Sequence, residues 1–471
     1  MSSTVETLES AAASVNAPLF SPECAGELDR VDPLAAMRAQ FHVPTFLPAA
    51  SGATRREQLY FTGNSLGLQP KATRALVDEE LSAWAAHGVE GHFVGARPWV
   101  DTDAFVVDEL AAMVGAERDE VAVMNSLTVN LHLFMVAFYA PTPARHKILI
   151  EADAFPSDWY AVESQIRLHG FDPATSLIRL PPRAGEHCVR EDDIEARLAA
   201  EAGAVALVLW PGVQYFTGQL FDIARITAAG HRHGAHVGVD LAHAVGNVPL
   251  RLHDWQVDFA AWCHYKYVNS GPGAIAGAFV HARHAGTSAA PARDQPPLRR
   301  LAGWWGHEFA TRFQMRSPFS PIPGAAGFRL SNPPVVAVAC VLGSLRTFAA
   351  VPGKYAALHR KSRLLTGYLE LLLQRHVQQR YERGTLEFLT PSAEAQRGCQ
   401  LSLLFGGRVD ARAMHKSLEQ RGVVCDFREP GSIRCAPVPL YNSFTDVYEF
   451  VAIVVELLDA MNVPHAATVV S

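Results

Sequence analysis

Apolar runs and amphipathic stretches alternate along the middle of the chain. Residues 205–210 form an apolar run, residues 222–233 carry apolar positions at helical spacing, and residues 237–241 begin with alternating apolar positions. This order predicts a strand, a helix and a second strand, which is a βαβ unit with parallel strands and a right-handed crossover. The pattern therefore predicts an α/β core.

Further strands and helices continue the alternation. Strands are predicted at residues 121–124 and 147–151, and helices follow them at 129–138 and 159–169. Another apolar run at residues 257–262 predicts a strand that leads into a glycine-rich turn. We therefore expect a large domain with a mixed, mostly parallel sheet that is flanked by helices.

The two ends of the chain add other elements. Residues 33–41 and 71–87 predict helices, the second with Leu76, Leu81 and Trp84 facing inward. The C-terminal third predicts a smaller α/β domain, with helices at 335–348, 355–376 and 446–461 and strands near 385–389 and 399–404. The expected domains are an N-terminal extension and arm that contributes to the small domain (1–60), a large domain (61–335) and a small C-terminal domain (336–471).

An acid and a lysine follow two of the predicted strands. Asp240 lies at the end of one strand, and Lys266 lies 26 residues further on, before a turn with several glycines. Pyridoxal 5'-phosphate chemistry needs both groups, because a lysine amine forms an imine with the cofactor and a carboxylate pairs with the pyridinium nitrogen. Such residues are more often a capping acid and a surface lysine, but Tyr265, Tyr267 and the glycine-rich turn favour a ligand.

Composition and charge narrow the class of protein. The chain has 471 residues, of which 49% are hydrophobic and 19% charged, so it can bury a large core and should form more than one domain. A net charge of −6 gives no reason to expect nucleic acid or a membrane surface as a partner. The longest apolar runs are far shorter than the roughly 20 residues that span a bilayer.

The seven cysteines and the first residues predict a cytosolic protein. The cysteines are odd in number, scattered and without a Cys-x-x-Cys pair, which is typical of reduced thiols and not of a disulfide framework or a zinc site. Residues 1–20 contain two glutamates, no lysine or arginine and no apolar core, which argues against a targeting sequence.

Several single residues are candidates with two interpretations. Thr128, at a helix start, suits a cofactor phosphate but is equally well explained as a helix N-cap, and the two roles can coexist. Phe155 could stack on a pyridine ring, whereas Asp158 is more commonly a helix N-cap. Arg434, on a short predicted strand, could bind a substrate carboxylate as a guanidinium fork, although an isolated arginine is more often a surface charge.

Three histidines lie close together in the sequence. His231, His233 and His236 surround Gly234 at the end of a predicted helix, where cationic or polar side chains favour the negative end of the helix dipole. We therefore predict no metal site. The proline- and arginine-rich residues 291–300 predict an exposed loop.

Ten stretches in the same order resemble the kynureninase family, over nearly the full length of the chain. They are GNSLGLQPK (63–71), GHFVGARPW (91–99), NSLTVNLHL (125–133), AFPSDWYA (154–161), QYFTGQ (214–219), DLAHAVGN (240–247), WCHYKY (262–267), GWWGHE (303–308), FRLSNPP (328–334) and IRCAPVPLYNS (433–443). The resemblance implies a fold-type I pyridoxal-phosphate enzyme.

The resemblance also assigns residues to the cofactor. It implies that Leu127 and Thr128 contact the phosphate, that Phe155 covers the ring face, and that Asp158 joins Asp240 in the cofactor network. His243 is implied to hydrogen-bond this region. Tyr265, beside Lys266, is implied as either a proton donor or a phosphate ligand.

The resemblance implies a substrate site and a homodimer. Ser65, His92, Asn332 and Arg434 are implied to bind substrate, with Arg434 on its carboxylate. Trp304 and Asn332 are implied to enter the cofactor site of the partner subunit, so that the two active sites of the homodimer are shared.

The implied reaction is the hydrolysis of L-kynurenine and 3-hydroxy-L-kynurenine to anthranilate or 3-hydroxyanthranilate plus L-alanine. Lys266 would remove the Cα proton while Asp240 keeps the ring charged, and His92 and Asn332 favour the 3-hydroxy substrate. An aminotransferase or a cysteine desulfurase would share the acid and the lysine but not the flanking motifs. A catalytically silent binding protein would have no need of Lys266, Asp240 and Arg434 together.

Overall fold

The computed structural model describes residues 2–48, 54–284, 298–315 and 318–466. The chain folds into two compact units. Unit 1 comprises Met1–Lys71, Tyr215–Leu220 and Thr347–Ser471, and unit 2 comprises Ala72–Gln214 and Phe221–Arg346. This division does not test the domain boundaries that we expected from the sequence, and those boundaries remain a prediction.

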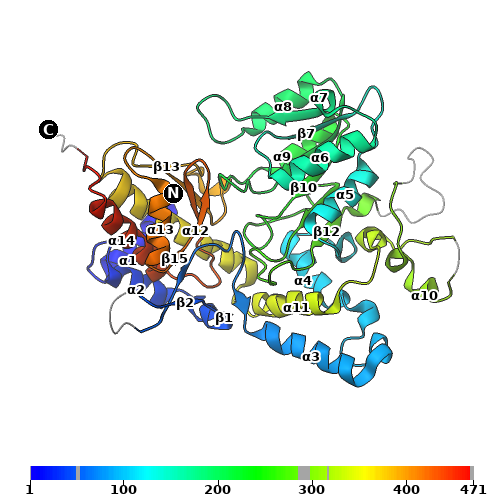
Figure 1. Ribbon diagram of the computed structural model, residues 1–471, viewed down its shortest axis with the longest axis horizontal. Helices are drawn as coiled ribbons and strands as arrows, with labels where there is room; N and C mark the ends of the chain where they lie inside the picture. The colour runs from blue at the N-terminus through cyan, green and yellow to red at the C-terminus, as the bar shows by residue number, and fades with distance from the viewer. Residues whose placement is uncertain (1, 49–53, 285–297, 316–317, 467–471) are drawn as a thin grey trace. The chain divides into compact units, whose positions relative to one another are not determined.

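Unit 2 is built on a seven-stranded sheet (Figure 1). Strand β12 is antiparallel to both of its neighbours, and the other six strands run parallel. The order across the sheet is β6 (Val121–Val123), β12 (Gly277–Val280), β11 (Phe259–Trp262), β10 (His236–Asp240), β9 (Val205–Pro211), β7 (Lys147–Glu151) and β8 (Leu177–Leu180). This mixed, mostly parallel sheet confirms the predicted α/β fold class.

Helices cover the sheet of unit 2, so that its strands other than the edge strand β8 are buried along almost their whole length. Helix α9 begins after Asp222, whose side chain caps it by accepting a hydrogen bond from the Arg225 N–H at 3.0 Å. The helices of this unit are α3 (Ala72–His87), α4 (Ala104–Val114), α5 (Leu127–Phe138), α6 (Pro156–Leu168), α7 (Pro173–Ser176), α8 (Glu191–Ala200), α9 (Ile223–Arg232) and α10 (Phe309–Arg312). Helix α11 (Val335–Ala349) begins in unit 2 and ends in unit 1.

Unit 1 has an antiparallel four-stranded sheet, ordered β13 (Leu386–Phe388), β14 (Leu401–Phe405), β17 (Ser432–Cys435) and β16 (Asp426–Arg428). Two-stranded pairs join β4 (Leu59–Tyr60) to β15 (Val423–Val424), β1 (Phe41–His42) to β5 (Gln69–Pro70), and β2 (Thr45–Phe46) to β3 (Arg56–Glu57). The first pair ties the N-terminal part of the chain to its C-terminal part.

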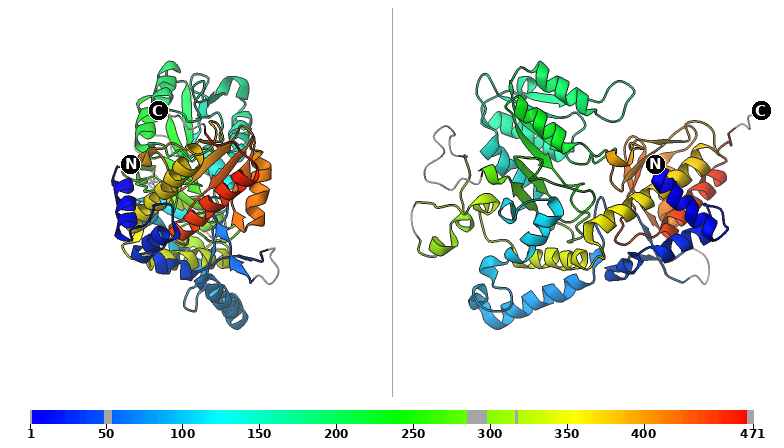
Figure 2. Two further views of the ribbon diagram at one scale, coloured as in Figure 1. Left: turned by 90° about the vertical axis from the view of Figure 1, so that its left-hand side faces the viewer. Right: turned by 180° about the vertical axis from the view of Figure 1, so that it is seen from behind.

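The helices of unit 1 come from both ends of the sequence. They are α1 (Ser2–Ser14), α2 (Pro22–Val31), α12 (Lys354–Leu373), α13 (Ala411–Gln420) and α14 (Phe444–Ala460). Helix α1 packs on α12 and α2 packs on α14, and Figure 2 shows the two blue helices in the same unit as the yellow-orange α12 and the red α14. Leu8, Leu28, Leu369 and Phe450 belong to the hydrophobic core that they bury.

Two helix predictions are wrong in detail. Residues 33–41 do not form one α-helix, because only Ala35–Gln40 is helical, as a 3₁₀ helix, before the chain enters β1. In α3, Leu76 is buried as predicted, but Leu81 and Trp84 are 46% and 67% exposed. The buried face of α3 is formed by other positions of the helix, so these two side chains lie outside it.

Three sequence expectations concern the chain as a whole. Each of the seven cysteines is a free thiol, which confirms the predicted absence of a disulfide framework. The predicted loop 291–300 lies mostly outside the described residues. Within the described ranges, no helix taken singly combines the length and apolarity that span a bilayer, and α11 with the helical segment Lys354–Gln378 meets that test only as a pair bent by 80°.

Candidate active site

The predicted acid of the site ends a central strand of unit 2. Asp240 is the last residue of β10, and its side chain is buried. Its Oδ1 accepts a hydrogen bond from the Ala242 N–H at 2.7 Å. Asp158, in the first turn of α6, is buried beside it and hydrogen-bonded to it. The structure therefore brings together the two carboxyl groups that the resemblance placed in one network.

The surroundings of Asp158 favour its protonated form. Burial, followed by the charge of Asp240 and the hydrogen bond to it, raises the pKa of Asp158 well above its usual range, and the charge of Lys266 opposes this only in part. Oδ1 of Asp158 is buried and has no hydrogen-bond partner among the described residues. A buried polar atom without a partner indicates a place where a ligand completes the network.

Lys266 lies in a tight turn after β11. The Asn269 N–H donates to the Lys266 carbonyl at 3.0 Å, and the Ser270 N–H donates to the His264 carbonyl at 3.0 Å. Asn269 has a φ of +54°, in the left-handed region that asparagine tolerates better than most residues. The Lys266 side chain is half-buried, with Nζ 5.4 Å from the centre of the Tyr265 ring. The turn fixes the backbone of the lysine and leaves its amine partly accessible.

A buried thiol lies beside Tyr265. Cys263 and Tyr265 are hydrogen-bonded through their side chains, and Cys263 Sγ lies 4.0 Å from the Ala242 carbonyl oxygen. Burial, followed by the influence of Cys263 and the charge of Asp240, raises the pKa of Tyr265. Tyr265 therefore keeps its proton and is available as a proton donor.

The predicted phosphate-binding segment lies at the start of α5. The helix begins at Leu127, two residues before the predicted start at residue 129, and Ser126 occupies the N-cap position. Thr128 therefore lies inside the first turn, where its Oγ1 is 2.8 Å from Oγ of Ser157 in the first turn of α6. Because Ser126 makes no side-chain capping bond, the first N–H groups of α5 suit an anion.

Phe155 and His243 lie next to these segments in the chain. Phe155 occupies the N-cap position of α6 and is 46% exposed, so Asp158 is not the N-cap of that helix. His243 is buried after β10, and its carbonyl oxygen accepts a hydrogen bond from Asn247 Nδ2 at 2.9 Å. The His243 ring lies 6.5 Å from the Tyr267 ring, at an interplanar angle of 74°.

His92, Trp304 and Asn332 lie in the connecting segments of unit 2. His92 ends the 3₁₀ helix Gly88–His92, and its ring lies edge-on to Trp99 with centroids 5.3 Å apart. Trp304 is 47% exposed. Oδ1 of Asn332 is buried and has no hydrogen-bond partner within the described part of the chain. Asn332 thus offers an acceptor to a ligand, as Asp158 does.

Arg434 lies in β17 of unit 1 and is not a surface charge. It is 1% exposed, and its Nη2 forms an ion pair with Asp426, the residue directly opposite in β16. Its Nη1 donates to the Tyr215 carbonyl oxygen at 2.5 Å. The guanidinium is therefore held from two sides.

Ser65 lies in a turn of the same unit. Its N–H donates to the Thr62 carbonyl at 2.8 Å, and Thr62 forms a parallel bridge with Ala436. Ala436 follows β17, which carries Arg434. The structure therefore brings the turn with Ser65 next to the end of the strand with Arg434.

The sequence reasoning missed Cys263, Ser157, Asp426 and Tyr215 as neighbours of the candidate residues. Cys263, Ser157 and Tyr215 lie inside quoted stretches, and position in the motif would have indicated them. Asp426 lies outside the stretches, and its role follows from the register of β16 with β17.

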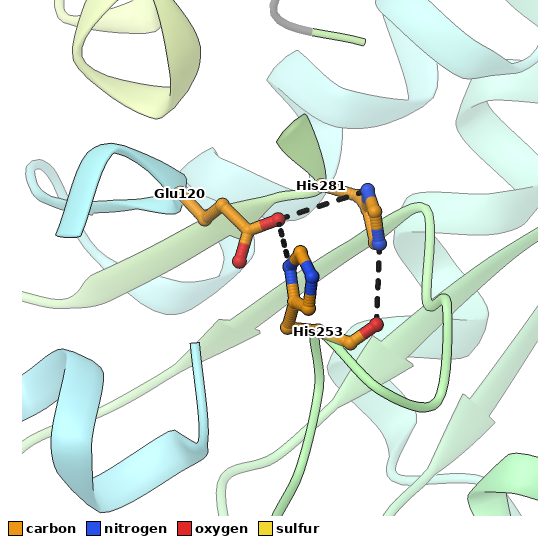
Figure 3. Close-up of side chains that lie close together, drawn as sticks. All are labelled: Glu120, His253 and His281. Atoms are coloured by element: carbon orange, nitrogen blue, oxygen red, sulfur yellow. Dashed lines mark hydrogen bonds and ion pairs between the residues drawn. The ribbon is translucent and has the colours of Figure 1, made fainter. Parts of the chain in front are cut away.

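Glu120, His253 and His281 form a cluster in unit 2 (Figure 3). Oε1 of Glu120 lies 2.9 Å from Nδ1 of His253 and 3.7 Å from Nδ1 of His281. The two imidazole rings are stacked, with centroids 4.9 Å apart and planes 16° apart. Because the lone pairs of an imidazole lie in its ring plane, two rings stacked face to face are poorly oriented to direct their nitrogen atoms at one ion. We interpret this cluster as a hydrogen-bond network.

Asp258 is the centre of a second cluster in unit 2. It is 1% exposed and contacts His231, His236 and His284. The Arg283 guanidinium lies 2.5 Å from it and already balances its charge. This arrangement is that of a buried ion-pair network.

The groups of unit 2 fit the predicted cofactor, pyridoxal 5'-phosphate. Lys266 supplies an amine, and the start of α5 supplies an anion site. Asp240 and Asp158 supply buried carboxyl groups, and Oδ1 of Asp158 still lacks a hydrogen-bond partner among the described residues. The role of each individual residue remains a prediction.

Two family models match parts of this chain, and solved structures with the same fold match most of it. Residues 358–454 match the kynureninase C-terminal domain, and residues 105–287 match the class-V aminotransferases. A mutant of C-DES with glycine covalently linked to its pyridoxal-phosphate cofactor has a TM-score of 0.69 at 15% identity, covering 84% of this chain and 96% of that one. The cysteine desulfurase CsdA of Escherichia coli has a TM-score of 0.67 at 18% identity, covering 91% and 98%. These structures share the fold.

Curated relatives cover nearly the whole chain. Kynureninase of Mus musculus is 48% identical over 464 residues, which are 97% of this chain and 97% of that protein. Kynureninase of Monosiga brevicollis is 49% identical, over 94% of this chain and 97% of that protein. Kynureninase of Xanthomonas campestris pv. campestris (strain B100) is 52% identical, over 91% and 96%. With this identity along almost its full length, the chain belongs to the kynureninase family.

Proposed function

We propose that this protein hydrolyses L-kynurenine and 3-hydroxy-L-kynurenine to anthranilate or 3-hydroxyanthranilate plus L-alanine, in tryptophan catabolism and NAD biosynthesis. The observation that carries the proposal is the identity of 48% to 52% with kynureninases over nearly the whole chain. Family membership confirms the enzyme class and the cofactor, pyridoxal 5'-phosphate, that the sequence predicted.

Lys266, Asp240 and Asp158 carry the chemistry at the cofactor in this proposal. Bound pyridoxal phosphate supplies an electron sink that stabilises negative charge at the substrate Cα. The Lys266 amine would hold the cofactor covalently, and the same amine would move the substrate Cα proton. The Asp240 carboxylate would pair with the protonated ring nitrogen, and Asp158 would donate a hydrogen bond to Asp240 that fixes the orientation of that carboxylate.

Tyr265 is the proposed proton donor for the cleavage of the Cβ–Cγ bond. A protonated Tyr265 suits this role and that of a phosphate ligand equally well, and the two roles leave different signatures in a variant. In the variant Tyr265→Phe, loss of a proton donor lowers kcat by about 10²- to 10⁴-fold at unchanged cofactor content. A variant that instead loses cofactor on dialysis, with normal kcat when reloaded, would assign Tyr265 to the phosphate.

Arg434, Ser65, His92 and Asn332 bind the substrate in this proposal. The buried Arg434 guanidinium suits an α-carboxylate, because a guanidinium offers two parallel donors. His92 and Asn332 offer polar groups to a 3-hydroxyl, so we propose a preference for 3-hydroxy-L-kynurenine. The comparison of kcat/KM on the two substrates tests this, and a marked preference for L-kynurenine would contradict it.

We also propose that the protein is a homodimer in which Trp304 and Asn332 complete the partner's site. An exposed aromatic cluster in unit 2 supports this proposal. Phe93 and Trp304 each lie 5.5 Å from Phe313, and these three rings are between 43% and 55% exposed. Exposed apolar patches of this kind are typical of subunit interfaces. Light scattering tests the proposal, and a fully active monomer would refute it.

The cytoplasm is the proposed location, because all seven cysteines are free thiols and a reducing compartment keeps them so. Cell fractionation of the source organism, followed by detection of the protein with a specific antibody, tests the location.

The activity itself is tested with the purified holoenzyme and Lys266→Ala as the control. Release of anthranilate from L-kynurenine, with alanine in equal amount, is the expected result. Two competing activities are excluded in the same assay series, because sulfide release from cysteine would indicate a desulfurase and amino-group transfer to a 2-oxo acid would indicate an aminotransferase. Borohydride reduction is expected to trap a modified peptide that contains Lys266.

A further inference from the structure

Cys425 and Cys435 lie opposite each other on neighbouring segments of unit 1. The antiparallel register of β16 and β17 ends at the pair Asp426 and Arg434, and one step further along the same register brings Cys425 opposite Cys435. Opposite residues in such a pair have Cα atoms about 4.5 to 5.5 Å apart, which lies within the range of disulfides. The two thiols are hydrogen-bonded to each other.

The surroundings make the two thiols chemically unequal. Both belong to the hydrophobic core of the unit, where Cys425 is 6% exposed and Cys435 is fully buried. His415 of α13 lies beside Cys425, with Nε2 2.9 Å from its carbonyl oxygen and a further hydrogen bond to its thiol. The hydrogen bond from Cys435 lowers the pKa of Cys425 to about 7, with burial opposing and His415 supporting the shift. Burial raises the pKa of Cys435.

We propose that Cys425 and Cys435 are a redox modification site, at which a peroxide converts the two thiols into a reversible cross-strand disulfide. The Cys425 thiolate attacks one oxygen of hydrogen peroxide, the O–O bond breaks, and the leaving hydroxide takes up a proton to become water. The Cys435 sulfur then attacks the Cys425 sulfenic acid, which forms the S–S bond and releases a second water. The two thiols lose two electrons and two protons, and one peroxide molecule accepts them.

The modification lies next to the proposed carboxylate-binding group. Cys435 directly follows Arg434, and Cys425 directly precedes Asp426, the ion-pair partner of that arginine. A disulfide fixes two Cβ atoms about 3.8 Å apart, so its formation constrains both segments that hold this ion pair. We expect the Arg434 guanidinium to shift and the substrate carboxylate to bind less tightly. This effect rests on the proposed function, whereas the modification itself does not.

The test uses the reduced, cofactor-loaded enzyme, treated with hydrogen peroxide and then with an alkylating agent. Non-reducing peptide mapping is expected to show one linked peptide pair that contains Cys425 and Cys435. KM for L-kynurenine is expected to rise about tenfold with little change in kcat, which corresponds to about 1.4 kcal/mol. A thiol reductant restores both the peptide map and KM.

Two variants sharpen the test. Cys435→Ser, or Cys435→Ala if the serine variant does not fold, is expected to form no cross-link and to keep its KM under the same treatment. Cys24→Ser, which removes a buried thiol of the same unit whose pKa is raised by burial, is expected to respond like the wild type.

Each other outcome counts against part of the proposal. Suppose that Cys425 and Cys435 are still alkylated, and so still reduced, after a dose of hydrogen peroxide that oxidises the half-buried Cys188 and Cys340. This result would overturn the proposed modification site. A cross-link without a change in KM would overturn the coupling to Arg434. An enzyme that forms the cross-link but never cleaves kynurenine would refute the proposed function and leave the modification site standing.

Discussion

The substitution Arg434→Lys separates charge from hydrogen-bond geometry at the proposed carboxylate site. The arginine is 1% exposed and already contacts Asp426 through Nη2 and the Tyr215 carbonyl oxygen through Nη1. A guanidinium has five donors, so it can make these contacts and still bind a carboxylate. A lysine keeps the positive charge on a single nitrogen, which cannot reach all three partners.

The expected magnitude follows from the contact that is lost. A hydrogen bond to a charged group contributes about 1.5 to 3 kcal/mol, and each 1.4 kcal/mol changes an equilibrium about tenfold. Loss of one of two such bonds to the substrate carboxylate therefore raises KM about 10- to 150-fold. Because the carboxylate takes no part in Cβ–Cγ cleavage, kcat should change little.

The assay follows anthranilate release over a range of L-kynurenine concentrations. A matched control is Arg412→Lys in α13, since the Arg412 side chain is 60% exposed and its ion pair with Glu429 lies on the surface. The control should keep the wild-type KM. If Arg434→Lys also kept the wild-type KM within about twofold, Arg434 would not bind the carboxylate and the reasoning would be wrong.

Three further variants test the chemistry and the buried networks. Lys266→Ala should lower kcat by at least about 10⁴-fold, measured by anthranilate release, because the amine that moves the Cα proton is gone. Asp258→Asn should lower the free energy of unfolding in urea by about 1.5 to 3 kcal/mol at pH 7, since it removes the buried carboxylate that pairs with Arg283 and accepts hydrogen bonds from the neighbouring histidines. Burial acts to raise the pKa of Asp258, but the hydrogen bonds from three histidines and the charge of Arg283 outweigh burial and lower this pKa. The stabilisation from Asp258 is therefore full above about pH 4, and it should shrink as the pH falls below that value. The hydrogen bond to Glu120 raises the pKa of His253 against the effect of burial. The difference in melting temperature between the wild type and Glu120→Gln should therefore fall as the pH rises above about 6.5. A difference that is the same at pH 6 and at pH 9 would contradict this prediction.

Much of the fold could be predicted from the periodicity of the sequence. Buried strands such as β7 and β9 read as apolar runs, and the helices between them have apolar positions at helical spacing. The failures have local causes. An apolar residue at helical spacing, such as Trp84, predicts burial only where another element covers that face, and nothing in the periodicity of α3 states which face is covered.

The part of the candidate site that the sequence predicted follows from the order of the strands and not from periodicity. Asp240 and Lys266 follow strands of one sheet, and groups at the ends of parallel strands collect at one edge, so their proximity follows from topology. The raised pKa of Asp158 depends on its burial beside a second carboxyl group, which spacing along the chain does not reveal.

Asp426 shows why the remaining part of the site depends on register. A buried arginine without a counter-charge would be costly, because removal of a charge from water is offset only by close partners. Asp426, directly across from Arg434 in β16, supplies that charge before any substrate is present, and the Tyr215 carbonyl oxygen fixes the second nitrogen. The guanidinium is thus ordered in advance, and a substrate carboxylate that binds it does not have to restrict the side chain. A shift of the two strands by one residue would turn Asp426 to the opposite face of the sheet and remove this support. The carboxylate site is therefore a property of the strand pairing as much as of the arginine itself.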